Sequence, residues 1–292
     1  MSVCQTEIRT PKGLGRFDVN KIPKSDILLL ESLYCLPFAK KYKETNDCKI
    51  ISMIVDTSFW IKKLSVFRKL YYKMYLDSVD AFITLSERSK KDIGKYMKAN
   101  GFQYKPIIVV RPFLANNFRK KINLTRNILF IGNAAREKGY LKLAKAMEHL
   151  PEFDLYLVGN CCKDVKKFGE NVHLEGRVSS LAKYFQLCTY YVHPADFEPF
   201  GVAPLEAMYS SLIPILTKEV GVREIFTKKL ERIVLSDNDP GSIARKIIEI
   251  DSLQVKKKIF IIKECRRIAN QYTKEKNIKL FKKEFYKLSK II

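Results

Sequence analysis

The strongest constraint on the fold of this chain is the alternation of short, β-rich apolar runs with amphipathic helical stretches along most of its length. Strand, helix, strand units of this kind predict parallel α/β sheets with right-handed crossovers, and a length of 292 residues suggests two such sheets. The expected strands are 27–30, 49–55, 81–85, 107–110, 127–131, 155–158, 172–174, 190–193, 213–216 and 233–234. The expected helices include 140–149, 180–187, 202–210 and 241–250, and only helical patterns follow residue 252.

Composition excludes several other classes of protein. Hydrophobic residues make up 47% of the chain and charged residues 29%, which is typical of a globular protein rather than a disordered one. The longest apolar runs have four residues, far short of the roughly 18 to 20 that a membrane helix needs. Seven cysteines without a C-x-x-C pair argue against a disulfide framework or a zinc site. The N-terminal residues lack the pattern of a secretory signal, so we expect a protein of the reducing cytoplasm.

The net charge of +23 is concentrated at the two ends of the chain. Residues 1–124 carry a surplus of 13 basic side chains and residues 251–292 a surplus of 9, whereas the middle is nearly neutral. We therefore expect the two basic ends to share a surface or a partner. Residues 58–73 mix aromatic and basic residues at helical spacing, which predicts either a helix that covers a domain core or a helix on a membrane surface.

The loop after the expected strand 127–131 is a first candidate site, because doubly wound sheets bind ligands at the carboxyl ends of their strands. Gly132 lets the backbone leave the strand tightly, and Arg136 and Lys138 put cations beside the start of a helix. This pattern suits a phosphate group, although solvated loop charges would have the same composition.

The loop after the expected strand 190–193 is a second and sharper candidate. Gly201 permits close backbone approach, and the helix that starts near it offers unpaired N–H groups to an anion. Glu198 and Glu206 flank this helix start and could accept hydroxyl groups of one ligand; they could equally serve only to favour the helix N-terminus. His193 ends the strand, where a place beside a ligand and a purely structural role are both open.

The segment from Phe130 to Phe226 resembles the C-terminal domain of retaining glycosyltransferases of family 4, which have the GT-B fold. The matching pieces are FIGNAAREKGYLKLAKAM, NVHLEGRVSSLAKYFQLCTYYVHPADFEPFGVAPLEAM, and IPIL followed by GVREIF, all in the order of the family. Weaker similarity continues through SDNDPGSIARKI and backward through DILLLESLYCLPFAKKY and DAFITLSERSKKDI. The resemblance therefore covers most of the chain.

The resemblance implies a nucleoside-diphosphate sugar as donor, a UDP- or GDP-sugar, with no metal and no further cofactor. In it, Lys138 contacts the diphosphate, Glu198 faces the donor sugar, and Glu206 binds the ribose hydroxyls. Lys138 and Glu198 are the catalytic candidates, and retention would follow from attack on the same face of the sugar. The complete set of implied donor-binding residues is Gly132, Arg136, Lys138, Glu198, Pro199, Phe200, Gly201, Val202 and Glu206.

Some positions depart from the family pattern. The arginine that usually follows the strand-end glycine is Asn133 here, so Arg136 would have to replace it. The glycine that usually follows the EAM segment is Ser211, and Val55 replaces a histidine found before the aspartate in many members. The N-terminal domain is short, and we expect its opening strand and glycine loop to be reduced to the segment around residues 13–16 or lost.

We therefore expect an α/β protein of the GT-B fold with two Rossmann-like domains that face each other across a cleft. Residues 1–121, joined by helices from about 271–292, would form a shortened acceptor domain, and residues 122–270 would form the donor domain. The expected function is that of a retaining hexosyltransferase with a glycan or a lipid-linked acceptor, peripheral to an anionic membrane. The alternatives are a sugar-nucleotide epimerase of the same fold, a noncatalytic member, and a nucleic-acid-binding basic protein, which the absence of a recognisable module disfavours.

The triplet Asp237-Asn238-Asp239 resembles a metal-binding acidic cluster, but Pro240 and Gly241 follow it. A turn in which Asp239 caps the next helix is the better prediction.

Overall fold

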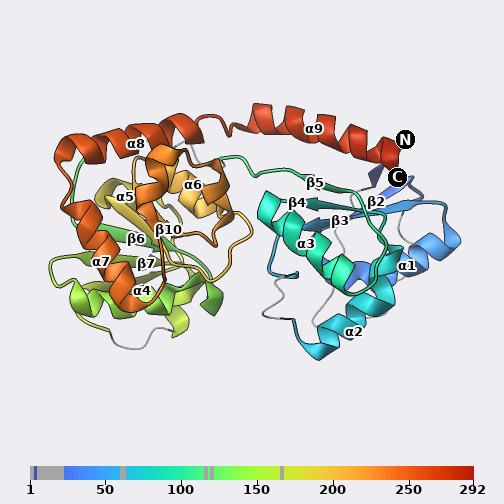
Figure 1. Cartoon of the computed structure of the whole chain (residues 1–292), viewed down its shortest axis with the longest axis horizontal. Coiled ribbons are helices and arrows are strands. Elements are labelled where there is room, and N and C mark those ends of the chain that lie inside the picture. Colours follow the sequence, from blue (N-terminus) through green and yellow to red (C-terminus); the bar gives the residue numbers. More distant parts are fainter. Residues whose placement is uncertain (1–2, 5–22, 60–63, 115–117, 119–121, 165–167) are drawn as a thin grey trace. The chain divides into compact units, whose positions relative to one another are not determined.

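The computed structural model describes residues 3–4, 23–59, 64–114, 118, 122–164 and 168–292. The chain divides into two compact units, each built on one parallel sheet: unit 1 takes Met1–Arg111 with Ile278–Ile292, and unit 2 takes Pro112–Asn277 (Figure 1). Every expected strand is present, with ends that differ by one or two residues at most. The alternation of apolar runs and helical stretches thus predicted the α/β class correctly.

The sheet of unit 1 has five parallel strands in the order β1-β2-β3-β4-β5. They are β1 (Val3–Cys4), β2 (Ile27–Leu30), β3 (Lys49–Ile54), β4 (Ala81–Thr84) and β5 (Ile107–Val109). The opening strand is reduced, as expected: Val3 pairs with Ile27 and Cys4 with Leu28 to form an edge strand of two residues. The segment 13–16 lies outside the described residues.

Helices α1 (Leu36–Thr45), α2 (Val66–Tyr75) and α3 (Glu87–Ala99) cover one face of this sheet. The core there is built from alternate strand residues such as Leu28, Ile50 and Phe82, with Tyr72 of α2 packed among them. The stretch 58–73 was expected to be helical throughout, but the helix begins only at Val66, where the Ser65 hydroxyl accepts from the Arg68 N–H and caps it. Residues 60–63, among them Trp60, lie outside the described part.

The opposite face of the unit 1 sheet is covered by α9 (Lys274–Ile291), the last helix of the chain. Leu288 is fully buried against Ile27, Ile51 and Ile83, and Phe281 and Phe285 pack against the same cluster. Within unit 1, α9 and α2 thus lie on opposite faces of the sheet. The basic C-terminal segment is thus part of the basic N-terminal unit, with α9 on the face of the sheet opposite to α2.

The sheet of unit 2 has six parallel strands in the order β11-β10-β9-β6-β7-β8. The strands are β6 (Asn127–Ile131), β7 (Asp154–Val158), β8 (Val172–Gly176), β9 (Tyr190–His193), β10 (Ile213–Thr217) and β11 (Val234–Leu235). β9 and β10 are buried at every position, as expected of central strands that are covered on both faces. The helices are α4 (Tyr140–Ala146), α5 (Ala182–Leu187), α6 (Val202–Tyr209), α7 (Pro240–Asp251) and α8 (Val255–Ala269).

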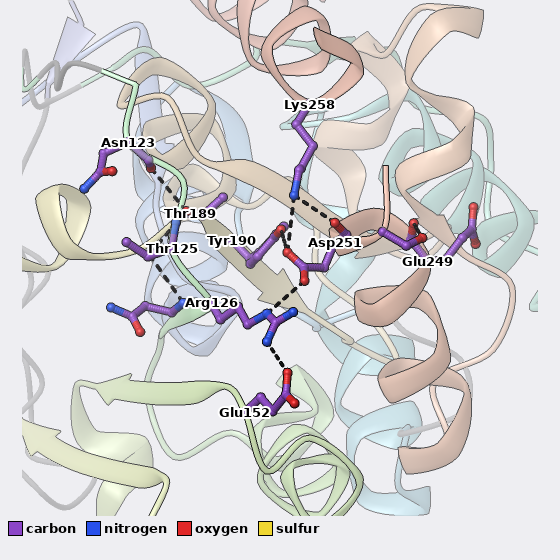
Figure 2. Close-up of polar contacts among 11 residues, drawn as sticks. Asn123, Thr125, Arg126, Glu152, Thr189, Tyr190, Glu249, Asp251 and Lys258 are labelled. Atoms are coloured by element: carbon purple, nitrogen blue, oxygen red, sulfur yellow. Dashed lines mark hydrogen bonds and ion pairs between the residues drawn. The ribbon is translucent and has the colours of Figure 1, made fainter. Parts of the chain in front are cut away.

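A polar network fastens the amino-terminal end of this sheet to α7 and α8, as Figure 2 shows. The carboxylate of Asp251, at the end of α7, accepts from the Tyr190 hydroxyl at 2.7 Å and from Arg126 Nε at 3.1 Å. Lys258 of α8 donates to the Asp251 backbone carbonyl at 2.8 Å, and Arg126 also contacts Glu152. This end of the sheet is therefore held by structural ion pairs, which leaves the carboxyl end for a ligand.

Candidate active site

The order of the strands places the two candidate loops next to each other. β6 and β9 are neighbours in the middle of the sheet, and the chain proceeds from β6 toward one edge and from β9 toward the other. Ligands of doubly wound sheets bind outside the carboxyl ends of the strands at such a switch point. The loop after β6 carries Gly132 and Lys138, and the loop after β9 carries Glu198 and Gly201. The fold therefore brings both candidate loops to the position where this topology binds its ligands.

Glycines allow the two loops to approach closely. Gly139 has a φ of +79°, and a Cβ there would lie against the backbone carbonyl of Pro194, 2.7 Å from its carbon. The N–H of Asp196 donates to the Glu137 carbonyl at 2.7 Å and adds a direct backbone link between the loops. At Gly132 a Cβ would meet the Phe130 ring at 2.7 Å. Any larger residue at Gly139 would thus push the loop after β6 away from the loop after β9.

The side chains of Lys138 and Glu198 form an ion pair across these loops. Lys138 Nζ donates to Glu198 Oε2 at 2.7 Å, and the side chains are 24% and 14% exposed. Lys138 ends a short 3₁₀ turn, Arg136–Lys138, directly before Gly139. Two residues that were singled out from separate motifs therefore meet in one partly buried pair.

The buried ring of His193 lies beside this pair. It is 1% exposed and its ring stacks on Phe130, with ring centroids 5.3 Å apart and planes 5° from parallel. His193 Nδ1 lies 3.2 Å from the Tyr191 hydroxyl, and His193 Nε2 lies 3.5 Å from Glu198 Oε2. His193 is thus a packed ring whose Nε2 faces the glutamate of the candidate site.

The charge states of these groups follow from their surroundings. Burial alone would raise the pKa of Glu198, but the neighbouring His193 ring and the Lys138 ammonium outweigh it and lower the pKa to about 2. Burial lowers the pKa of His193, so its ring is held in the neutral form. The site thus presents a permanent carboxylate beside a cation. It can accept hydrogen bonds from hydroxyl groups and attract phosphate, but Glu198 cannot donate a proton near neutral pH.

The backbone around Glu198 is fixed on its other side by the loop after β10. Glu198 N–H donates to the Glu219 carbonyl at 3.1 Å, and the Gly221 N–H donates to the Glu198 carbonyl at 2.9 Å. A Cβ at Gly221 would lie against the carbonyl of Pro199. The segment from Glu198 to Gly201 is therefore held by backbone contacts rather than by flexible side chains.

Helix α6 begins directly after this segment. Its N-cap is Gly201, with a φ of +93°, and no side chain caps the helix N-terminus. The N–H groups of its first turn are thus not satisfied by a capping side chain. Glu206 lies in the second turn and is 8% exposed, so it is a buried residue rather than an exposed helix-start charge.

The remaining site residues are less closely associated with the pair. Phe200 is fully buried, and Val202 is partly exposed at the first position of α6. The side chain of Arg136 is exposed, on the same 3₁₀ turn as Lys138.

One residue of this region was not picked out from the sequence as part of the site. Asn238 Nδ2 donates to the Pro194 carbonyl at 3.2 Å and to Asp196 Oδ1 at 2.8 Å, which anchors the loop that carries Glu198. The neighbouring Asp239 accepts from the Ser242 N–H at 3.0 Å and caps α7, which confirms the predicted turn. Among the described residues, no group of three or more histidine, cysteine or acidic side chains could hold a metal ion.

Solved structures share this fold over nearly the whole chain. Alr3699/HepE from Anabaena, solved in complex with UDP and glucose, superimposes with a TM-score of 0.73 at 14% sequence identity, covering 91% of this chain and 78% of that one. Sucrose-phosphate synthase from Thermosynechococcus elongatus gives a TM-score of 0.75 at 16% identity, covering 92% and 75%. The GT-B fold expected from the sequence is confirmed by these similarities.

The relatives found by sequence match this chain over only part of their own length. The uncharacterized glycosyltransferase MJ1178 of Methanocaldococcus jannaschii is 23% identical over 247 residues, 79% of this chain and 67% of that protein. A 41.2 kDa protein from the cps region of Klebsiella pneumoniae is 24% identical over 225 residues, 72% of this chain and 61% of that protein. The chain thus spans about two thirds or less of the length of these relatives.

Residues 115–275, more than half of the chain, match the family of glycosyl transferases group 1. The chain belongs to this family, and the matched region contains both loops of the candidate site. In the described parts of the chain, no helix is both long and apolar enough to cross a membrane.

Proposed function

We propose that this chain is a retaining hexosyltransferase that takes its sugar from a nucleoside-diphosphate donor bound at the carboxyl end of the unit 2 sheet. The Lys138–Glu198 ion pair is the observation that carries the proposal. It puts a cation for a diphosphate and a carboxylate for sugar hydroxyls within one contact distance, at the switch point of a doubly wound sheet.

The departing diphosphate is stabilised from two directions in this proposal. Lys138 and Arg136 approach it from the loop after β6, while the N-terminus of α6 offers backbone N–H groups from the other side. Because negative charge on the diphosphate grows as the glycosidic bond breaks, these groups act most strongly in the transition state. Gly132 leaves room for the phosphate beside Lys138.

The sugar and the nucleoside are held by the two glutamates. Glu198 accepts hydroxyl hydrogen bonds of the donor sugar, and the backbone of Pro199, Phe200, Gly201 and Val202 borders the sugar and its phosphate. Glu206 accepts the ribose hydroxyls from the second turn of α6. Glu198, whose pKa is lowered to about 2, is a weak base, and the neutral His193 ring is buried. The proton of the acceptor hydroxyl therefore passes to the leaving phosphate as the new glycosidic bond forms on the same face of the sugar.

A UDP-sugar is the favoured donor. Alr3699/HepE, which shares the fold over 91% of this chain, is described in complex with UDP-glucose. GDP-sugars remain the alternative from the sequence, and the acceptor is a glycan or a lipid-linked group, bound by unit 1.

Thermal unfolding with a panel of donors tests the proposal. UDP-glucose, GDP-mannose and ADP-glucose are added to the full chain, and hydrolysis of each is followed by release of the free nucleotide. We expect UDP-glucose to raise the melting temperature and to be hydrolysed slowly, and Glu198→Gln to abolish hydrolysis. Glu148→Gln, which changes an exposed glutamate of the same unit, is the matched control. If no nucleotide sugar shifts the melting temperature, the donor site is wrongly assigned.

A further inference from the structure

Helix α2 of unit 1 exposes its apolar side chains instead of burying them. Phe67 is 84% exposed, Val66 71%, Met74 62% and Leu70 54%. Val66, Leu70 and Met74 follow each other at intervals of four residues and therefore lie on one face of the helix, with Phe67 beside them. We call these four residues the outward stripe. Exposed apolar residues are ordinary when scattered, but a continuous stripe of them marks an interaction surface.

The inner face of α2 accounts for why the stripe points outward. Tyr72 is the buried residue of the helix, and its hydroxyl donates to the Ser58 carbonyl at 2.8 Å. Tyr71 is half-buried beside it, and its hydroxyl donates to the Leu33 carbonyl at 2.9 Å. The helix is thus fixed to unit 1 by tyrosines with satisfied hydroxyls, while its aliphatic residues remain in water.

The charges that border the stripe indicate the kind of partner that it binds. Lys69 and Lys73 are exposed and border the stripe on the side away from Phe67, and α2 contains no acidic residue. Between Asp56 and Asp77 the sequence holds five basic residues and no acidic one. A second copy of the chain would bring like charges together across a two-fold interface, which opposes self-association. Apolar residues flanked by cations match a bilayer that carries anionic lipids.

A cavity next to the stripe adds a place for a lipid headgroup. It has a volume of about 310 Å³ and is lined by Leu33, Tyr34, Ser65, Phe67 and Arg68, among others. The Arg68 guanidinium donates to the Tyr34 hydroxyl at 3.2 Å, which holds it at the wall of the cavity. A phosphate that entered from the membrane side would meet this guanidinium.

We propose that the outward stripe of α2, with Lys69 and Lys73, is the surface by which the protein docks on an anionic membrane. α2 lies in the plane of the membrane, with Val66, Phe67, Leu70 and Met74 among the acyl chains and the two lysines at the phosphate level. This inference goes beyond the proposed function, because docking does not depend on donor chemistry.

Vesicle co-sedimentation of the full chain tests the proposal. Vesicles of phosphatidylcholine alone are compared with vesicles in which part of it is replaced by phosphatidylglycerol, at low and at high salt. We expect binding to the anionic vesicles only, weakened by salt. Phe67→Gln with Leu70→Gln should weaken binding by about 100-fold or more, because both side chains lose their place among the acyl chains. Lys69→Gln with Lys73→Gln should weaken it by about 30-fold.

Matched controls separate the stripe from general basicity. Two controls change exposed residues of the same kinds on α8 of unit 2. Val255→Gln should leave the apolar contribution to binding unchanged. Lys256→Gln with Lys257→Gln should reduce binding by less than Lys69→Gln with Lys73→Gln does. Melting temperatures with UDP-glucose should be the same for the parent and the α2 variants, which keeps this test independent of the donor site. Absence of binding to anionic vesicles at low salt, or equal binding by parent and α2 variants, overturns the proposal. So does a dimer in light scattering that Phe67→Gln with Leu70→Gln dissolves.

Discussion

Lys138 and Glu198 are 60 residues apart in the sequence, and their side chains meet at 2.7 Å between the loops that follow β6 and β9. Each residue satisfies the charge of the other across the two loops. In the proposed reaction, an incoming diphosphate competes for Lys138 and leaves the Glu198 carboxylate to the sugar hydroxyls. The ion pair thus prepares both groups at the same place, and replacing either one leaves a partly buried charge without its main partner.

Lys138→Ala should lower the turnover rate more than the affinity for the intact donor. The charge that Lys138 stabilises grows as the bond to the sugar breaks, so the loss falls mainly on the transition state. Calorimetry gives the donor affinity, and steady-state kinetics gives the rate. Lys145→Ala, which removes an exposed lysine of α4, is the control. Equal losses in affinity and rate would make Lys138 a binding residue without a catalytic role.

Glu206→Ala should weaken UDP binding by about 10- to 100-fold, because hydrogen bonds to a charged acceptor contribute about 1.5 to 3 kcal/mol. Glu206→Gln keeps the shape and one acceptor, so its loss should be smaller. Calorimetric titration with UDP measures the affinity of both variants. Their affinity for uridine should fall by the same factors, because the contact is to the ribose. A Glu206→Ala protein that binds UDP as tightly as the parent, with its fold intact by circular dichroism, would contradict the ribose role.

The stability of unit 2 should fall on acidification in two stages. The pKa of the buried His193 is lowered from its usual value of 6.5, so the unfolded chain takes up a proton first and stability declines as the pH falls below 6.5. The pKa of Glu198 is lowered from 4.5 to about 2, so a second decline, on the order of 3 kcal/mol, follows between those values.

His193→Gln should remove the first of these declines, whatever its effect on stability at neutral pH. Denaturant unfolding at a series of pH values measures the slope for parent and variant. Identical slopes between pH 6.5 and 4.5 would show that His193 does not cause the decline.

Ser211→Gly should stabilise the protein by about 1 kcal/mol or less. Ser211 has a φ of +75° just after α6, a left-handed conformation that costs a residue with a Cβ about 1 to 2 kcal/mol. Glycine removes this strain but adds about 0.5 to 1 kcal/mol of unfolded-state entropy. Denaturant unfolding measures the difference. A lower stability would mean that the buried hydroxyl contributes more than the strain costs.

Gly139→Ala should destabilise the protein by about 2 kcal/mol or more, through a left-handed φ and a clash with Pro194. Donor binding should weaken as well, because Lys138 moves with this loop. Gly94→Ala provides the contrast: a Cβ there meets nothing within 4 Å, and α3 should gain about 0.5 to 1 kcal/mol. A harmless Gly139→Ala would show that the two loops do not need to touch.

The strands and the site loops could be predicted from the sequence because parallel, doubly covered strands are nearly continuous apolar runs. Tyr190–His193 and Ile213–Thr217 are of this kind, and the polar residues that follow such runs mark the binding edge. β1 could not be predicted, because a pair of residues carries no periodicity. The start of α2 was misplaced because aromatic and basic residues before Val66 have the same spacing as those inside the helix.

The contacts within the site were harder to predict. Nothing in the sequence pairs Lys138 with Glu198, since that contact depends on how closely Gly139 lets two loops approach. The anchoring role of Asn238 was hidden for the same reason, because its partners Pro194 and Asp196 are more than 40 residues away. The buried place of His193 depends on stacking with Phe130 from a neighbouring strand.

The packing of α9 on the unit 1 sheet determines the order in which the protein can mature on the ribosome. Ile27, Ile51 and Ile83 emerge early, but Leu288, which covers them, is synthesised after every residue of unit 2. Unit 2 can therefore complete its core while one apolar face of the older unit still waits for its cover. The nascent chain carries this uncovered face while unit 2 is synthesised, and a ribosome that stalls before α9 leaves a product in which unit 2 is finished and unit 1 is not.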